Sequence, residues 1–565
     1  MAPDRTGDTY RDTYDVVVIG AGAGGMAAAC LAAARGLRVL LSEAAPQIGG
    51  TTAISGGMMW MPGNHVTSRA GAPDRAADAR AYLAATVPLG ANAAVREAFL
   101  AHASEAVADL EIRTELRFRP VRRYPDYYPD LPGASLGGRV LEAERFDARL
   151  LGADFALLRP PLPEFMLFGR MMVAREDLPS FLRVGRSWSA TARVARLLAA
   201  YAGQRLRHPR GTTLVLGNAL AGRLLLSLRR LGVTLRLGTS AVGLLARDGA
   251  IIGARLAGPE GGAMVRAARG VVLATGGFSH DAALRARLLP GASGSLSATV
   301  ASDAGDGIRL GCEAGGRLES GNANHAFWVP ASRYRRRNGS DGVFPHTVTD
   351  RGKPGLIAVN RAGRRFVNEA LSYHEFVLAM LRDANAAPAW LVCDRDFLWR
   401  YGLGVVRPFA LSLRWPIGSG YLLRGATIPA LATAAGIDPD SLAATVARFN
   451  GDAARGEDPE FGRGGDAYQR HMGDASVVPN PCVRPILHPP FFAVRVEPAD
   501  LGTATGLAVD ASARVLGADG APIPGLFACG NDMASVMNGA YPGPGITLGP
   551  ALTFAYLAAR RLADE

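Results

Sequence analysis

The chain has 565 residues, which is enough for two to four domains with large buried cores. It is 48% hydrophobic and 20% charged, and this composition excludes an intrinsically disordered protein. The five cysteines are scattered and none stands in a C-x-x-C or zinc spacing. We therefore expect a cytoplasmic protein from a reducing compartment, with no metal site.

The net charge of +12 raises the question of a nucleic-acid or membrane partner. We expect no nucleic-acid partner, because no binding motif accompanies the charge. Arginine clusters such as Arg205, Arg207 and Arg210 are interpreted as a solvated face, with attraction to an anionic membrane surface as the alternative. No apolar stretch is long enough for a signal-peptide core at the N-terminus or for a transmembrane helix elsewhere.

The first elements along the chain predict a dinucleotide-binding unit. A buried strand over 16–19, an alanine-rich helix over 27–34 and a second strand over 37–41 are expected in that order. Glycines between the first strand and the helix give the pattern G-x-G-x-x-G, at Gly20, Gly22 and Gly25. They allow a tight turn, close approach of a pyrophosphate, and helix–strand packing. Glu43 ends the second strand, where an acid accepts hydrogen bonds from ribose hydroxyls.

Later segments repeat this close approach of backbone to a ligand. Residues 51–57 are small or hydroxylated, so they permit contact with a flat ring and supply donors to its polar edge. An apolar strand over 271–274 ends in Thr275-Gly276-Gly277, and residues 303–307 precede a short helix in the same manner.

The remaining elements are predicted from periodicity and turn residues. Residues 75–118 are expected to be helical, and residues 190–232 to form two helices. Strands over 241–246 and 251–256 are expected to form a hairpin. The stretch that follows residues 303–307 and runs to Leu487 lacks a nucleotide signature and contains a predicted helix over 441–450.

We therefore predict an α/β protein with a split Rossmann-like domain for the dinucleotide and an inserted α+β catalytic domain. The first part of the nucleotide domain is placed at residues 1–320 and its last part at 490–565. The inserted domain is placed at 321–489, with the active site at the interface between the two domains.

Taken together, the motifs resemble the flavoprotein subunits of succinate dehydrogenase and fumarate reductase. Within that superfamily they are most similar to the bacterial 3-ketosteroid Δ1-dehydrogenases. The resemblance covers essentially the whole chain. It rests on segments that begin at Gly20, Thr51, Tyr124, Gly137, Arg364, Asp500, Ala534 and Tyr541.

This resemblance implies FAD as the cofactor. The binding is expected to be noncovalent, because the histidine that some members use for flavin attachment is missing near Ser55. The implied FAD-binding residues lie in the glycine turn, the hydroxyl-rich stretch, the second sheet edge and the C-terminal loop. They are Gly20, Gly22, Ala23, Gly24, Gly25, Glu43, Gly50, Thr51, Thr52, Ser55, Gly56, Gly57, Val242, Thr275, Gly276, Gly277, Asp306, Gly530, Asn531 and Leu548.

The resemblance also implies a reaction, the 1,2-desaturation of a lipophilic 3-ketosteroid with a quinone or another compound as electron acceptor. The Tyr541 hydroxyl and the Gly545 N–H would hold the ketone oxygen, and Tyr373 would take the C2 proton. The hydride from C1 would go to flavin N5. Tyr127 would hydrogen-bond Tyr373 and help to lower its pKa from about 10, with Tyr128 as the alternative for that role.

Departures from related patterns define the alternatives. The chain lacks the cationic residues with which dicarboxylate reductases hold their substrate, since Asp500-Leu-Gly-Thr and the Tyr541 loop stand in their place. Phe327-Trp328 and Asp350 differ from the steroid-family pattern and are expected to line the substrate cavity. The alternatives are a Δ4-desaturase or an enoate- or fumarate-type reductase on another substrate, and a flavin-binding protein without turnover.

Overall fold

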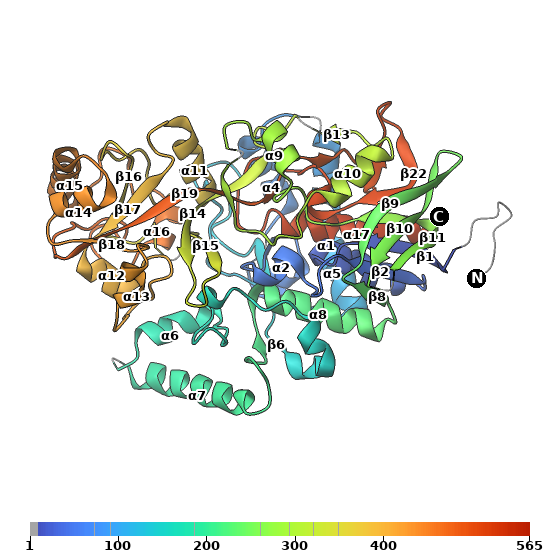
Figure 1. Ribbon diagram of the computed structural model, residues 1–565, viewed down its shortest axis with the longest axis horizontal. Helices are drawn as coiled ribbons and strands as arrows, with labels where there is room; N and C mark the ends of the chain where they lie inside the picture. Colours follow the sequence, from blue (N-terminus) through green and yellow to red (C-terminus); the bar gives the residue numbers. More distant parts are fainter. Residues whose placement is uncertain are drawn as a thin grey trace.

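The computed structural model describes residues 10–564 except 73, 91, 186, 260, 293, 320 and 348–349. The N-terminal nine residues, on which the signal-peptide prediction partly rests, lie outside the described residues. Two large sheets organise the chain, one near each end of the molecule (Figure 1).

The first sheet has the strand order β21-β22-β11-β1-β2-β8, with β10 and β9 continuing from β11. Strands β22, β11, β1, β2 and β8 run parallel to one another, whereas β21 and β10 pair antiparallel with β22 and β11. Because both faces of such a sheet are covered, β1 ends in the apolar run Val16 to Ile19, which is almost fully buried. The strands are β1 (Asp12–Ile19), β2 (Val39–Glu43), β8 (Thr234–Leu237), β9 (Ser240–Arg247), β10 (Ala250–Gly258), β11 (Gly261–Leu273), β21 (Arg514–Leu516) and β22 (Pro522–Ala528).

The second sheet has the order β15-β14-β19-β17-β16, with β12 and β18 also pairing with β19. Its long central strand β19 runs from this sheet toward the middle of the molecule (Figure 1). The strands are β12 (Leu296–Ser297), β14 (Ala326–Arg335), β15 (Asp341–Pro345), β16 (Leu356–Val359), β17 (Ala389–Cys393), β18 (Leu423–Gly425) and β19 (Phe491–Thr503).

The remaining strands of the described chain form smaller sheets. β3 (Met58–Trp60), β5 (Val140–Ala143) and β4 (Phe118–Pro120) form a three-stranded sheet. β13 (Leu318–Glu319) pairs with β20 (Gly506–Leu507), and β6 (Phe146–Asp147) pairs with β7 (Thr213–Leu214).

Helix α1 is alanine-rich and buried along most of its length because it packs against α17 and α8 as well as the first sheet. Helices α6 and α7 lie at the lower edge in Figure 1, and the helices from α11 to α16 accompany the second sheet. The helices are α1 (Ala23–Ala33), α2 (Gly50–Ile54), α3 (His65–Arg69), α4 (Ala76–Thr86), α5 (Ala93–Arg113), α6 (Leu178–Leu182), α7 (Trp188–Arg205), α8 (Leu216–Arg230), α9 (Ala282–Leu288), α10 (Asp306–Glu313), α11 (Tyr373–Arg382), α12 (Arg395–Tyr401), α13 (Arg414–Gly418), α14 (Ile428–Ala435), α15 (Pro439–Ala453), α16 (Ala467–Met472) and α17 (Leu548–Asp564). Within the described chain, no helix is both long and apolar enough to cross a bilayer.

The predicted fold class is confirmed, with a parallel nucleotide-type sheet and a separate mixed α+β part. The hairpin β9–β10, the two helices α7 and α8, and helix α15 lie where the sequence predicted them. The helical prediction over 75–118 is confirmed for most of this range, but the short connection inside it and its last residues are not helical. The chain there forms α4 and α5, and it ends in strand β4, because Pro88 and Gly90 interrupt the helical backbone.

The division into domains is less simple in space than in sequence. β19 begins directly after residue 489 and pairs with strands of the second sheet. The chain returns to the first sheet only at β21 and β22. The predicted bounds 1–320, 321–489 and 490–565 stay a prediction.

Candidate active site

The glycine turn between β1 and α1 combines tight packing with one open position. A Cβ on Gly20 would lie 2.3 Å from the Ala274 carbonyl oxygen, and one on Gly25 would lie 1.9 Å from the Gly20 oxygen. A Cβ on Gly22 would meet nothing within 4 Å. Gly22 is also the N-cap of α1 and supplies no side chain, so the helix N-terminus faces open space. That space suits a pyrophosphate, which the N-terminus of a helix attracts.

Glu43 supports this turn from the end of β2. Its carboxylate accepts hydrogen bonds from the N–H groups of Ala21, at 2.7 Å, and Ala45, at 2.9 Å. Burial raises the pKa of Glu43, and the two backbone hydrogen bonds oppose that shift. The carboxylate therefore fixes the backbone of the glycine turn, and its role as an acceptor for ribose hydroxyls stays a prediction.

The hydroxyl-rich stretch packs on the same helix end. The Thr52 hydroxyl accepts a hydrogen bond from Ala23 N–H at 3.1 Å, and the Thr51 hydroxyl donates to Asp303 at 2.8 Å. Gly57 has φ +65°, and a Cβ there would lie 2.2 Å from the Gly217 nitrogen. Gly50, Ser55 and Gly56 belong to this same segment.

Asp532 joins the second glycine segment to the C-terminal loop. Its carboxylate accepts hydrogen bonds from the Thr275 N–H at 2.5 Å and from the Thr275 hydroxyl and the Gly277 N–H, both at 3.0 Å. The Gly307 N–H in turn donates to the Thr275 hydroxyl at 2.9 Å. Burial raises the pKa of Asp532 to about 6. Three segments far apart in sequence are thereby held at one place.

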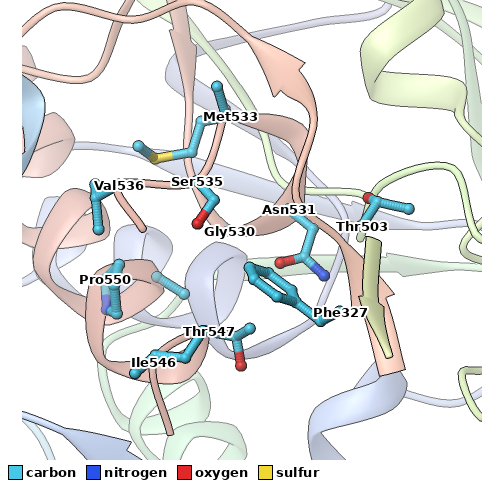
Figure 2. Close-up of a pocket in the computed structure, with 12 residues that line it drawn as sticks. Phe327, Thr503, Gly530, Asn531, Met533, Ser535, Val536, Ile546, Thr547 and Pro550 are labelled. Atoms are coloured by element: carbon cyan, nitrogen blue, oxygen red, sulfur yellow. The ribbon is translucent and has the colours of Figure 1, made fainter. Parts of the chain in front are cut away.

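A small cavity of about 20 Å³ lies beside these segments. Figure 2 shows the Phe327 ring beside Asn531, Thr503 and Thr547. Gly530 and Asn531, predicted as cofactor residues, line the cavity. Leu548 follows the lining residue Thr547 and begins α17.

Apart from Gly530 and Asn531, the predicted cofactor residues do not line this cavity, and Val242 and Asp306 are examples. Val242 is 56% exposed on β9, and Asp306 forms an ion pair with Arg309 in the first turn of α10. Neither lines the cavity.

The predicted catalytic tyrosines meet in one buried cluster, although they come from distant segments. The Tyr127 hydroxyl donates to the Tyr373 hydroxyl at 3.0 Å. The Tyr541 ring stacks on Tyr127, with centroids 5.8 Å apart, and meets Tyr373 edge to face at 5.1 Å. The ring of Phe327, which lines the cavity, meets the Tyr541 ring edge to face, with centroids 5.3 Å apart. The cluster therefore adjoins the cavity through Phe327.

The geometry separates the two adjacent phenols of the loop. Tyr128 donates its hydroxyl to Glu375 at 2.7 Å and not to Tyr373. Tyr127 is thus the phenol that contacts Tyr373.

The pKa of Tyr373 differs from the expected direction. Burial raises it well above 10, while the hydrogen bond from Tyr127 acts in the lowering direction. The expected effect of Tyr127 therefore has the predicted sign, but burial outweighs it. Burial also raises the pKa of Tyr541 to about 12.

Gly545 follows Tyr541 by four residues in the C-terminal loop. It has φ +87°, and a Cβ there would lie 2.5 Å from the Met58 carbonyl carbon and oxygen. Its carbonyl accepts a hydrogen bond from the Trp60 N–H at 3.0 Å. Only glycine fits this approach of the loop to β3.

A buried ion-pair network fixes the loop that carries Tyr127. Arg139 contacts Asp74 at 2.8 Å and Asp126 at 2.6 Å, and all three side chains are at most 5% exposed. Asp126 also accepts a hydrogen bond from the Trp60 indole at 2.9 Å. The Tyr127 N–H donates to the Pro542 carbonyl at 2.9 Å, which ties this loop to the residue after Tyr541.

The sequence interpretation assigned no role to several groups near the site. These groups are four charged residues, namely Asp303, Asp532, Asp126 and Arg139. Asp126 and Arg139 stand inside segments on which the family resemblance rests. Their opposite charges were the available sequence signal for the buried ion pair that they form. Nothing in the local sequence marks Asp303 or Asp532 as buried.

Comparison with known proteins agrees with this geometry. A model of the FAD binding domain family matches residues 15–548. A 4-oxocyclohex-2-ene-1-carboxylate 5-dehydrogenase from Sinomonas cyclohexanicum is 38% identical over 97% of this chain and 93% of its own. A 3-oxosteroid 1-dehydrogenase from Mycobacterium tuberculosis is 37% identical over 98% of both chains.

A solved structure is also similar over its whole length. It is the 3-ketosteroid delta1-dehydrogenase from Sterolibacterium denitrificans in complex with 1,4-androstadiene-3,17-dione. It has a TM-score of 0.90 and 37% sequence identity, covering 98% of this chain and all of its own.

The glycine turn, the open helix N-terminus and the family match define a flavoprotein that binds FAD. Within that class, the chain belongs to the family of the bacterial 3-ketosteroid Δ1-dehydrogenases and is an FAD-dependent oxidoreductase acting on CH–CH groups.

Proposed function

We propose that the protein catalyses the 1,2-desaturation of a 3-ketosteroid. The observation that carries this proposal is the buried cluster in which Tyr127 donates to Tyr373 while Tyr541 packs against both. A phenol can lie in an apolar pocket and still exchange a proton, which suits a lipophilic ketone.

Each of these residues has one task in the proposal. The Tyr541 hydroxyl and the Gly545 N–H donate hydrogen bonds to the ketone oxygen and stabilise the negative charge that develops on it. Tyr373 takes the C2 proton, and Tyr127 stabilises the Tyr373 oxygen by its hydrogen bond at 3.0 Å. FAD, when bound, supplies the acceptor for the C1 hydride. The open position at Gly22, with Gly530 and Asn531 beside the small cavity, would hold it, without a covalent bond.

The burial of the cluster has a consequence for the donors and for the base. Because water is excluded, a hydrogen bond from Tyr541 to a developing enolate is stronger than it would be in water. The same burial keeps Tyr373 as a neutral phenol at pH 7, since its pKa lies well above 10. Tyr373 can therefore accept the C2 proton of the substrate only if it gives up its own hydroxyl proton at the same time.

The test is the substitution Tyr373→Phe in the FAD-loaded protein, titrated anaerobically with 4-androstene-3,17-dione. The wild type should bleach the oxidised flavin band and form the 1,4-dien-3-one. The variant should keep its flavin and lose turnover by at least about 100-fold. Tyr401→Phe is the matched control, because Tyr401 is bonded to Asp474 outside the cluster. Full activity of the Tyr373→Phe variant would contradict the proposal.

A second candidate substrate class is a monocyclic oxo-acid. The dehydrogenase from Sinomonas cyclohexanicum named for 4-oxocyclohex-2-ene-1-carboxylate is as similar to this chain as the steroid enzymes are. A substrate carboxylate needs a donor, and the buried Nε2 of His374 has no hydrogen-bond partner among the described residues. Flavin bleaching by 4-oxocyclohexanecarboxylate, and not by the steroid, would favour this class.

Electron acceptor and location are proposed more broadly. We propose a quinone or a comparable acceptor to reoxidise the flavin in a cytoplasmic protein. Peripheral contact with an anionic membrane is supported by Trp188, 92% exposed at the start of α7, and by Arg207, exposed just beyond the other end of this helix. Cosedimentation with vesicles that contain anionic lipid, compared with neutral vesicles, tests this contact.

A further inference from the structure

The proton that Tyr373 takes has to leave a closed cluster. Tyr373 is 7% exposed and Tyr127 is 3% exposed, so neither delivers a proton directly to water. Each turnover releases one such proton, and the base must lose it before the next. This requirement rests on the proposed function.

We propose that Tyr124 and His471 form the exit by which this proton passes from Tyr127 to solvent. Tyr124 stands three residues before Tyr127 in the same loop, and His471 lies in α16 at the protein surface. The two rings are in contact, with centroids 4.8 Å apart. The path is thus Tyr373, Tyr127, Tyr124, His471 and water.

The Tyr124 hydroxyl is the unusual group on this path. It is buried and has no hydrogen-bond partner among the residues that the structure describes. Leaving a buried hydroxyl unpaired costs about 1–3 kcal/mol, so such groups call for an explanation. Tyr124 lies within electrostatic reach of the Tyr127 phenol, which makes it the next hydroxyl along the loop.

Two cations act on the outer end of the path. The Arg175 guanidinium lies 5.7 Å from the centroid of the Tyr124 ring. Burial raises the pKa of Tyr124, and Arg175 and Arg351 both act in the opposite direction. Arg351 is buried and donates its side-chain hydrogen bonds to backbone carbonyls, so no carboxylate among those bonds neutralises it. Negative charge is therefore better tolerated on Tyr124 than its burial alone would permit.

His471 is suited to hand a proton to water without retaining it. Although His471 is exposed, partial desolvation of its ring by neighbouring atoms, and then the charges of Lys353 and Arg175, lower the pKa of His471 to about 4. The imidazole is neutral at pH 7 and has a nitrogen free to accept. A proton that reaches it leaves for solvent.

The transfer balances as a relay. In the structure the Tyr127 hydroxyl donates to Tyr373, so the two hydroxyls first rotate until Tyr373 donates to Tyr127 and the Tyr127 proton points toward Tyr124. The C2–H bond then breaks, and its proton forms an O–H bond at Tyr373 while the Tyr373 proton moves to Tyr127. Tyr127 passes its own proton to Tyr124, and Tyr124 passes one through His471 to water. The electron pair of the C2–H bond stays with the substrate as the enolate, and the C1 hydride carries two electrons to the flavin. One proton is released, and every phenol ends with the proton it needs.

A neighbouring phenol provides the matched control. Tyr468 is buried, its hydroxyl is also unpartnered within the described chain, and its ring lies 4.7 Å from that of Tyr127. The surface contact, however, belongs to Tyr124 and not to Tyr468. A role in packing around Tyr127 would affect both phenols alike, whereas the relay requires only Tyr124.

The experiment follows exchange of the C2 hydrogens of 4-androstene-3,17-dione with deuterium from D2O, by NMR, on holoenzyme whose flavin has been reduced beforehand. Hydride transfer is then blocked, and exchange reports only proton movement through Tyr373. Flavin reduction by the steroid is measured separately on the oxidised holoenzyme. The variants are Tyr124→Phe, His471→Asn and the control Tyr468→Phe, each checked for bound FAD.

We expect exchange to fall by about 10-fold or more in Tyr124→Phe and in His471→Asn, and to stay within about 2-fold of wild type in Tyr468→Phe. Imidazole added to the buffer should restore exchange in His471→Asn, which a structural role would not produce. His471 is exposed, so this variant should fold even where Tyr124→Phe fails to.

Wild-type exchange in both relay variants, or an equal loss in Tyr468→Phe, would overturn the relay alone. A wild-type protein that neither exchanges C2 hydrogen nor reduces its flavin would contradict the proposed function, and the relay with it.

Discussion

Replacing Arg139 by methionine should destabilise the protein and disturb the loop that carries Tyr127. Arg139 is 1% exposed and pairs with Asp74 and Asp126, which are themselves buried. Removing one partner of a buried pair leaves charge without compensation and costs about 3–5 kcal/mol. The loss should be seen in unfolding as well as in activity, because Asp126 immediately precedes Tyr127.

The expected change in melting temperature follows from chain length. The entropy of unfolding is about 2.1 cal mol⁻¹ K⁻¹ per residue, or about 1.2 kcal mol⁻¹ K⁻¹ for 565 residues. A loss of about 4 kcal/mol therefore lowers Tm by about 3 °C. Arg80→Met is the control, because the Arg80–Glu97 pair is about half exposed on both sides, and its Tm should change by less than about 1 °C.

The loss of melting temperature in Arg139→Met should also depend on pH in one defined direction. Burial raises the pKa of Asp126, and Arg139 opposes that shift, so Arg139→Met should raise it further. A carboxyl whose folded-state pKa lies above its unfolded value binds a proton more readily when folded, so stability increases as pH falls through the folded value. The Tm deficit of the variant should therefore be larger at pH 8 than at pH 5.5. An unchanged Tm, or a deficit that grows as pH falls, would refute the reasoning.

Three further predictions concern the donors and the cofactor site. Tyr541→Phe should keep FAD but slow flavin reduction by about 100-fold, measured by stopped flow, and a rate near wild type would exclude an oxyanion role. Gly22→Ala should fold, since its Cβ meets nothing within 4 Å, and bind FAD more weakly in a fluorescence titration. Gly25→Ala should fail to fold, because its Cβ would lie 1.9 Å from the Gly20 oxygen. Equal FAD affinity of the Gly22→Ala and Gly25→Ala variants would contradict the expected difference between the two positions. Asp532 has its pKa raised to about 6, so its contribution to stability should increase as pH falls from 6 to 4. Asp532→Asn should remove that part of the Tm–pH curve, and an unchanged curve would assign the slope to other groups.

The nucleotide part of the fold was predictable because its requirements are local. A tight turn, a buried strand and a helix N-terminus without a side-chain cap are specified by neighbouring residues from Val16 to Gly25. The break between α4 and α5 was equally local, with Pro88 and Gly90 as its signal, but helical composition on both sides concealed it.

The site was predictable only in part, because its contacts join distant residues. Family motifs brought Tyr127, Tyr373 and Tyr541 together as candidates, yet the choice between Tyr127 and Tyr128 depended on which phenol the folded loop turns toward Tyr373. The direction of the Tyr373 pKa could not be predicted either, since it depends on how completely the cluster excludes water.

Exclusion of water creates both the strength of the site and its main difficulty. In the proposed mechanism it would strengthen the hydrogen bonds that Tyr541 donates to an enolate, and it keeps Tyr373 protonated at neutral pH. A protein that relied on a solvated base would avoid the second effect but would weaken the first. The structure retains both by placing further phenols behind the base, with Arg175 and Arg351 acting on the outermost of them. The proton that the closed cluster takes from the substrate is thereby passed toward the surface, where water can accept it.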